Sequence, residues 1–352
     1  MRLLGGNDLY ILLRALTSEN CQRLLHALEN ELGIYSTPTS PSKAIIHQPS
    51  RTSITTKQQH TTLFMPASDT SSTGIKIITL PGQGGTAEGV INIFASEGKI
   101  LGLLAASEIT AFRTALNTMI LFTRSPLTKK HLVVFGSGKQ AEWHIRLALQ
   151  FGPVEIEKIT IVNRGRQRLE KFEDEVLSKL RQVYPSVEFQ LLAKEGRSAT
   201  DFASSLRSEL GTSNAIFCCT PSTEPLFSNT YLKPRVGEAP KQRFICLIGS
   251  YKPHMQEVDA GTLLSGDRIW VDSKEACLME SGELIRAKVQ EEQLREIGEL
   301  FSAGAGSGVI VVPDGRNLIL KCVGMGIMDL VVGRVLLEIA KEQNIGISVD
   351  SF

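Results

Sequence analysis

The sequence predicts an α/β protein of two domains, and three observations support this prediction. The chain has 352 residues, enough for about two domains that each bury a core. Residues 131 to about 315 alternate short apolar strands with helical segments, as in a doubly wound parallel sheet. Residues 74–106 instead hold consecutive strands, the last two joined by a short turn at Gly98, which predicts a largely antiparallel sheet.

Composition excludes several classes of protein. The hydrophobic fraction of 42% and the charged fraction of 21% are ordinary for a globular protein. The net charge is +1 and there is no long basic run, so nucleic acid is not an expected partner. The sequence shows no apolar run of about 18 residues and no signal-peptide pattern, so we expect no membrane partner.

The six cysteines favour a reducing compartment. They form no C-x-x-C pair, and no set of Cys and His has zinc-finger spacing, so no metal site is expected. Cys218, Cys219 and Cys246 lie in apolar runs, where a thiol usually acts as a small core residue. We therefore expect a cytoplasmic protein.

The first part of the chain mixes helices, an irregular segment and strands. Residues 8–33 place leucines on one helical face and predict an amphipathic helix or a helix pair. Residues 36–73 are rich in Ser, Thr and Pro, yet 44–46 and 63–65 resemble strands or ordered turns, so this segment is interpreted as irregular but folded. The remaining predictions are strands at 75–80, 90–94 and 100–104, then a helix at 107–122.

The second part of the chain alternates predicted strands and helices. Right-handed crossovers would place these strands side by side in one sheet. A long charged helix is predicted at about 166–182 and a last amphipathic helix at 323–343. The predicted strands cover 132–135, 159–162, 187–192, 215–219, 244–248 and 269–271.

The stretch 131–141 predicts a dinucleotide site. Four apolar residues end at Gly136, which permits a tight turn, and Gly138 removes a Cβ that would block a pyrophosphate. Ala141 is small enough for close packing of helix on strand, and the helix would point its first N–H groups at the phosphates. Taken alone, the pattern is equally typical of a plain strand-to-helix turn.

The residues after the second strand of this part bear on which nicotinamide cofactor is bound. A site that prefers NAD usually has a carboxylate there, but the sequence reads Asn163, Arg164, Gly165, Arg166. Guanidinium groups suit a phosphate, so NADP(H) is favoured over NAD(H); the alternative is two solvated arginines at a helix start. Thr220, after the strand at 215–219, could bind the ribose or a phosphate, or could simply belong to a turn.

Three features in one order resemble the ornithine cyclodeaminase/mu-crystallin family. They are Lys76 in a strand, the segment 106–115 with Arg113 and Thr114, and its spacing to the glycine turn. The resemblance covers roughly residues 50–330. It implies a homodimer with a discontinuous α+β substrate-binding and dimerisation domain, residues 1–124 and 318–352, and a Rossmann NADP(H)-binding domain, residues 125–317.

The resemblance also implies the site residues. Arg51 and Arg113 resemble the family's carboxylate-binding arginines, and Lys76 its catalytic lysine. The physics agrees: two guanidiniums can clamp a substrate carboxylate, and an inward lysine would have a lowered pKa suited to proton exchange with a substrate nitrogen. The alternative is that Lys76 points to solvent. The expected cofactor-binding residues are Thr114, Gly136, Ser137, Gly138, Gln140, Asn163, Arg164, Arg166, Thr220 and Gly249.

Three residues differ from the family pattern, and one of them bears on which reaction the protein catalyses. Tyr251 stands where ornithine-cyclising members have an aspartate, which favours an NAD(P)H-dependent reductase of a small cyclic imino acid such as 1-pyrroline-2-carboxylate or 1-piperideine-2-carboxylate. Cys322 and Gly326 replace the usual Ser and Ala, while Asp329 fits the pattern.

Three alternatives to the reductase remain. The first is an ornithine cyclodeaminase that releases ammonia, in which Glu257, Asp259 or another carboxylate replaces the missing aspartate. The second is an amino-acid dehydrogenase or N-alkylating enzyme using the same site. The third is a non-catalytic NADPH-binding protein of the crystallin type. This alternative is disfavoured because the chain retains Arg51, Lys76 and Arg113.

Overall fold

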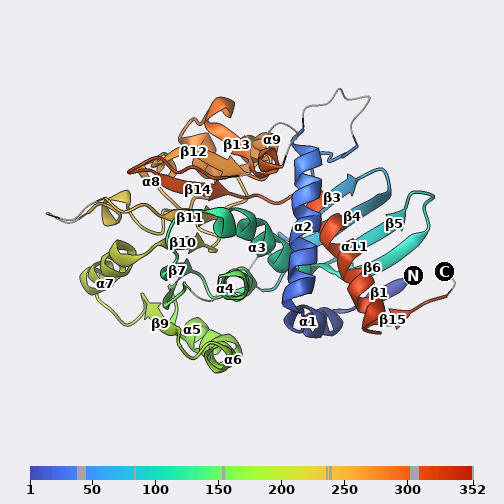
Figure 1. The fold of residues 1–352 in the computed structure, drawn as a ribbon, viewed down its shortest axis with the longest axis horizontal. Helices are drawn as coiled ribbons and strands as arrows, with labels where there is room; N and C mark the ends of the chain where they lie inside the picture. Colours follow the sequence, from blue (N-terminus) through green and yellow to red (C-terminus); the bar gives the residue numbers. More distant parts are fainter. Residues whose placement is uncertain are drawn as a thin grey trace. The chain divides into compact units, whose positions relative to one another are not determined.

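The computed structural model describes residues 1–37, 45–82, 85–152, 155–234, 237, 240–301 and 309–350. The chain forms two compact units, drawn in Figure 1. The first unit comprises Met1–Asn117, Ile297–Gly308 and Gly324–Phe352, and the second comprises Thr118–Glu296 and Val309–Val323. Among the helices that the structure describes, none combines the length and the hydrophobicity needed to span a membrane.

The first unit is built on a mixed sheet of seven strands, counted over the described residues. Its order is β15-β1-β6-β5-β4-β3-β2, and the neighbours from β2 to β6 are antiparallel. The strands are β1 (Arg2–Leu4), β2 (Thr52–Thr55), β3 (Thr61–Ser68), β4 (Ser72–Leu80), β5 (Glu88–Ala95), β6 (Ile100–Ala105) and β15 (Ile347–Ser348). The predicted antiparallel sheet is confirmed.

One face of this sheet packs on helix α11 (Gly326–Glu342), which in turn packs on α2 (Ser18–Tyr35) (Figure 1). Side chains alternate along β3, β4 and β5, so that Met65, Lys76 and Ile91 lie opposite one another on the covered face. The opposite face carries apolar side chains that are only half-buried. These are Phe64, Pro66, Ile75, Ile77, Val90, Phe94 and Leu103, here called the outer face.

The other helices of the first unit are short or shared. Helix α1 (Gly6–Arg14) precedes α2, and the 3₁₀ turn η5 (Ile297–Leu300) packs against α2. Helix α3 (Ala106–Arg124) follows β6 directly, and the division between the two units falls within it, after Asn117.

The second unit is a doubly wound sheet of eight parallel strands among the residues that the structure describes. Its order is β13-β12-β14-β11-β10-β7-β8-β9, and the direction of winding reverses between β7 and β10. Ligands of such sheets bind outside the carboxyl ends of the strands at this switch point. The strands are β7 (His131–Phe135), β8 (Lys158–Asn163), β9 (Glu188–Ala193), β10 (Ala215–Cys218), β11 (Phe244–Leu247), β12 (Gly266–Val271), β13 (Leu294–Glu296) and β14 (Asn317–Lys321).

Helices connect these strands, as the alternation predicts. The predicted charged helix is observed, although a π-helical turn, η2 (Glu173–Leu177), interrupts it. The connecting elements are α4 (Lys139–Phe151), α5 (Arg166–Phe172), α6 (Ser178–Val183), α7 (Ala199–Thr212), η3 (Asn229–Tyr231), α8 (Ala260–Leu263), α9 (Lys274–Glu280), α10 (Gly282–Arg286) and η4 (Glu291–Gln293).

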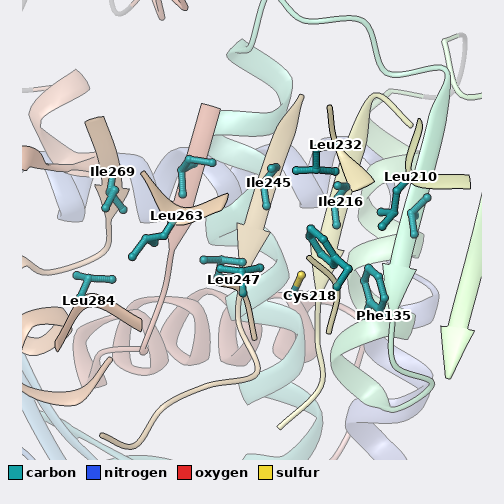
Figure 2. Close-up of a cluster of buried hydrophobic side chains, with 14 of the residues drawn as sticks. Phe135, Leu210, Ile216, Cys218, Leu232, Ile245, Leu247, Leu263, Ile269 and Leu284 are labelled. Atoms are coloured by element: carbon teal, nitrogen blue, oxygen red, sulfur yellow. The ribbon is translucent and has the colours of Figure 1, made fainter. Parts of the chain in front are cut away.

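A hydrophobic core covers one face of the eight-stranded sheet (Figure 2). Ile216, Ile245 and Ile269 come from three strands, and Leu210, Leu263 and Leu284 come from the helices packed on them. All six side chains are almost inaccessible to solvent. Each buried aliphatic side chain contributes about 1.5–3 kcal/mol, so this core holds the strand ends in a fixed frame.

The segments predicted as strands or ordered turns have different structures. Residues 63–65 belong to β3, Ile45 and Ile46 lie outside the strands, and Ala44 lies outside the described residues. The compact units also divide differently from the predicted domains: 118–124 and 318–323 belong to the second unit, and 297–308 to the first. Residues 318–321 belong to the second unit because they lie in β14, which pairs with β11 and β12.

Candidate active site

Lys76 points into the covered face of the first unit. Its neighbours Ile75 and Ile77 lie on the outer face, so strand alternation directs the lysine toward α11. The side chain is 2% exposed. The alternative in which Lys76 points to solvent is therefore excluded by its burial.

Asp329 on α11 lies between two buried cations. One carboxylate oxygen, Oδ2, is 2.7 Å from Lys76 Nζ, and the other, Oδ1, accepts a hydrogen bond of 3.0 Å from Arg113 Nε. All three side chains are at most 3% exposed. The carboxylate thus joins β4, α3 and α11 and fixes the lysine and the arginine relative to each other.

The backbone beside Arg113 is shaped to admit its guanidinium. Gly324 has φ +87°, and a Cβ built there would lie 2.8 Å from both Nη1 and Nη2 of Arg113. Only glycine combines this left-handed conformation with so close an approach. Met328 places its sulfur 3.4 Å from Nη1, which adds a weak contact.

Arg51 belongs to the same electrostatic environment. It is partly buried and directly precedes β2. Gln48, three residues earlier, accepts a hydrogen bond of 2.7 Å from the backbone N–H of Ile327 at the start of α11, so this segment is tied to the helix that carries Asp329.

These surroundings lower the pKa of Lys76 to about 8. Burial of the ammonium is the main cause; the Asp329 carboxylate opposes it, and the positive charges of Arg113 and Arg51 add to it. A lysine with such a pKa can hold or release a proton near neutral pH. With two cations on Asp329 and the positive charge of Arg51 acting on Lys76, the site suits a ligand that brings a carboxylate of its own.

The predicted cofactor residues after β7 form a tight glycine turn. Gly136 has φ +113°, and a Cβ there would lie 3.0 Å from the backbone oxygen of Cys219 and 3.1 Å from Oγ1 of Thr220. Gly138 is the N-cap of α4, is exposed, and a Cβ there would meet no atom within 4 Å. The glycine turn therefore brings the ends of β7 and β10 together at the switch point and leaves open space before a helix N-terminus, which is the arrangement that receives a pyrophosphate.

The two arginines after β8 are exposed, and a carboxylate lies beside them. Asn163 donates from Nδ2 to the backbone oxygen of Gly165, and Glu195 N–H donates to the backbone oxygen of Arg164. The Glu195 carboxylate accepts a hydrogen bond of 2.8 Å from Arg166 N–H. Sequence reasoning missed Glu195 because it follows β9, about thirty residues beyond the strand end where such a carboxylate is sought.

The other predicted cofactor residues lie on or next to four elements. Thr220 and Gly249 follow β10 and β11, which are neighbours in the sheet. Ser137 and Gln140 flank the start of α4. Thr114 lies in the part of α3 that belongs to the first unit, where its hydroxyl donates to the backbone oxygen of Thr110. Arg51, Lys76 and Arg113 are brought together in the first unit, and the remaining cofactor residues in the second.

The replaced residues of the family pattern have structural roles. Cys322 donates from Sγ to Oδ2 of Asp272 over 3.0 Å, as a serine hydroxyl in its place would do. A Cβ built on Gly326 would lie 2.8 Å from the backbone oxygen of Met65. A side chain at 326 would push α11 away from β3.

Comparisons with known proteins agree with this geometry. The model of the ornithine cyclodeaminase/mu-crystallin family matches residues 17–344. An uncharacterized protein of Saccharomyces cerevisiae is 30% identical over 310 residues, 79% of this chain and 80% of its own. The Delta(1)-pyrroline-2-carboxylate reductase of Bacillus cereus is 26% identical over 317 residues, 85% of this chain and 87% of its own.

A solved structure shows the same fold. The Thermococcus litoralis Delta(1)-pyrroline-2-carboxylate reductase, in complex with NADH and L-proline, superposes with a TM-score of 0.78 at 21% identity. The match covers 99% of this chain and 100% of that chain.

Replacing the bridging carboxylate tests the cluster. We expect Asp329→Asn to lower the pKa of Lys76 below about 8, because the attraction that opposes burial is lost while Arg113 remains. We also expect a loss of about 3–5 kcal/mol in unfolding free energy, as for other broken buried ion pairs. NMR titration of the labelled lysine and chemical denaturation measure the two effects. Asp350→Asn, at an exposed position, is the control. An unchanged Lys76 pKa in Asp329→Asn would contradict the assignment.

Proposed function

The chain belongs to the ornithine cyclodeaminase/mu-crystallin family, and from this premise we propose that it is an NAD(P)H-dependent reductase of a small cyclic imino acid. A ketimine such as 1-pyrroline-2-carboxylate is the proposed substrate. The observation that carries the proposal is the buried Lys76–Asp329–Arg113 cluster, which offers an anion site beside a lysine able to exchange a proton near neutral pH.

The reaction needs a hydride, a proton and an oriented substrate. Gly136, Gly138 and the start of α4 would hold a nicotinamide cofactor, which supplies the hydride when bound. Arg113 and Arg51 would hold the substrate carboxylate, and Asp329 keeps Arg113 in place. The Lys76 ammonium would keep the imine nitrogen protonated, which makes its carbon a better hydride acceptor. The imine, the reduced cofactor and one proton then yield a cyclic amino acid and the oxidised cofactor.

The comparisons support this choice of substrate. The Bacillus cereus relative carries the name of a pyrroline-2-carboxylate reductase, and the Thermococcus litoralis structure holds NADH and L-proline. Proline is the product expected when the C=N bond of 1-pyrroline-2-carboxylate is reduced.

Two carboxylates that could have served a cyclodeaminase are engaged elsewhere. Glu257 accepts hydrogen bonds from the backbone N–H groups of Thr220 and Gly249. Asp259 is the N-cap of α8 and also accepts from Asn229 N–H. Because both carboxylates are engaged in backbone hydrogen bonds and Tyr251 stands at the aspartate position, reduction is favoured over ornithine cyclisation.

We propose that NADP(H) is preferred to NAD(H), because the exposed Arg164 and Arg166 follow β8, where the adenosine ribose is bound in such folds. Glu195 works against this preference, since its carboxylate lies at the N–H of Arg166 and would repel a 2′-phosphate. The attraction by the two arginines and the repulsion by Glu195 together would set the ratio of NADPH affinity to NADH affinity.

We further propose that the protein is a homodimer whose subunits meet through the outer face of the seven-stranded sheet. Seven apolar side chains lie there half-buried in one chain, among them Phe64, Ile77 and Phe94. Such a contiguous apolar surface is typical of a subunit interface, and a second copy would cover it.

An assay of the purified protein tests the reaction. We expect NADPH and 1-pyrroline-2-carboxylate to be consumed in equal amounts with formation of proline. With NADPH saturating, we expect kcat/KM for the imino acid to fall as the pH rises through about 8, because Lys76 then loses its proton. Lys76→Ala should lower kcat by about 100-fold or more.

Other outcomes of the same assay would overturn the reductase. Ammonia and proline formed from ornithine without net use of cofactor would establish a cyclodeaminase. Tight NADPH binding without turnover of a panel of ketimines would establish a binding protein.

Cofactor selectivity has its own test. Arg164→Ala should weaken NADPH binding by about tenfold more than NADH binding, because a guanidinium contacts a phosphate in a charge-assisted pair worth about 1.5–3 kcal/mol. Glu195→Gln should shift selectivity the opposite way. Arg168→Ala, at another exposed arginine on α5, is the control. Equal effects of Arg164→Ala on the two cofactors in fluorescence titrations would refute the phosphate contact.

Light scattering tests the assembly. We expect the wild-type protein to have twice the mass of one chain in solution and Ile77→Lys to have the mass of a single chain, because a buried ammonium would face the second copy. Ser96→Lys, in the exposed turn after β5, should remain dimeric. A wild-type protein of single-chain mass at micromolar concentration contradicts the proposal.

A further inference from the structure

A cluster of buried charges in the second unit is not used by the proposed reaction. Glu257, Glu283 and Lys321 are each at most 2% exposed, as is Ser250. Lys321 ends β14, Ser250 follows β11, and Glu283 lies in the first turn of α10. The cluster therefore lies at the carboxyl ends of neighbouring strands, on the edge of the sheet where a dinucleotide binds.

Glu257 holds the backbone after two of these strands. Its Oε1 accepts a hydrogen bond of 3.0 Å from Thr220 N–H, after β10. Its Oε2 accepts from Gly249 N–H at 2.7 Å and from Ser250 N–H at 3.3 Å, after β11. One carboxylate thus clamps the ends of adjacent strands through three backbone donors.

The clamp requires a close approach that only glycine allows. A Cβ on Gly249 would lie 2.3 Å from the backbone oxygen of Thr220 and 2.5 Å from Oε1 of Glu257. Thr220 in turn contacts the glycine turn, since its Oγ1 is 3.1 Å from a Cβ built on Gly136. A shift of Glu257 would therefore move Thr220, and with it the turn that would receive the pyrophosphate.

A second layer holds Glu257 in place. The Glu283 carboxylate accepts from Glu257 N–H at 2.8 Å and from the Ser250 hydroxyl at 2.5 Å. Lys321 Nζ donates to the backbone oxygen and the hydroxyl of Ser250, each at 2.5 Å, and lies 3.7 Å from Glu283. The backbone on both sides of the clamp is thereby fixed.

We propose that Glu257 is a positioning residue for the nicotinamide cofactor, which it serves by clamping the backbone after β10 and β11 beside the glycine turn. The inference rests on the proposed function, because it presumes that this edge binds a dinucleotide. Glu257 acts through Thr220 and Gly249. The proposal thus adds Glu257, a fully buried carboxylate, to the two residues that are predicted to bind the cofactor.

The protonation state of Glu257 decides how many backbone N–H groups its side chain can bind. Burial raises the pKa of Glu257 to about 8; Lys321 opposes this, Glu283 adds to it, and the backbone N–H groups of Thr220 and Gly249 lower it. The nearby thiols of Cys218, Cys219 and Cys246 stay neutral, because burial raises their pKa. Above pH 8 the ionised carboxylate can accept all three N–H bonds, whereas its protonated form turns one oxygen into a donor.

The test compares dinucleotide binding by wild-type protein and Glu257→Gln. An amide has the shape of the carboxylate, but its NH₂ group must face at least one of the three N–H donors whichever way it is turned. The probe is the reduced cofactor that the wild type binds more tightly, titrated between about pH 7 and 9.5, where a 2′-phosphate is already ionised. Melting temperatures are recorded at each pH, and Glu292→Gln, exposed in η4, is the matched control.

We expect Kd to be raised about tenfold in Glu257→Gln relative to wild type at pH 9. We expect wild-type affinity to increase as the pH rises through about 8, whereas the variant shows no such change. A variant that melts at a lower temperature but keeps the wild-type Kd and pH dependence overturns the positioning role and leaves the proposed function intact. A wild-type protein that binds neither NADH nor NADPH overturns both.

Discussion

The ion cluster of Lys76, Asp329 and Arg113 is the constraint on which the first unit depends. Its three members come from a strand, a terminal helix and the helix that follows the sheet, and all are buried. Two buried cations without a carboxylate between them would cost several kcal/mol, so the elements are held in one arrangement. That arrangement also leaves the pKa of Lys76 near 8, because Asp329 offsets only part of the burial penalty.

The second unit uses a buried carboxylate in a different way. Glu257 accepts hydrogen bonds from backbone N–H groups rather than bridging two cations, and it thereby joins the ends of β10 and β11. Each unit thus contains a buried carboxylate that fixes neighbouring groups in place. In the first unit this carboxylate orients side chains, and in the second it orients backbone.

Particular elements show where sequence reasoning succeeded and failed. Period-two alternation in β4 did not predict that Lys76 faces inward, because a lysine between two isoleucines is more often directed to solvent. The resemblance to the family assigned Lys76 to the site, and the structure shows its side chain buried. Asp329 fitted the family pattern but was not recognised as a site residue, although a carboxylate in the apolar stretch of α11 was a usable signal. Glu195 and Glu257 carried no such signal, because their partners are backbone groups distant in sequence.

The sequence by itself determined the fold class and the position of the glycine turn, which follow from local periodicity and from the steric needs of a turn. The three residues assigned to the substrate follow from the resemblance to the family and stay a prediction. Only the tertiary structure decided that β14 completes the parallel sheet, that Glu195 lies beside Arg166, and that Asp329 and Glu257 are the buried acceptors. The physical reason is that a buried charge is stable only where folding brings its partners to it, and those partners lie far away along the chain.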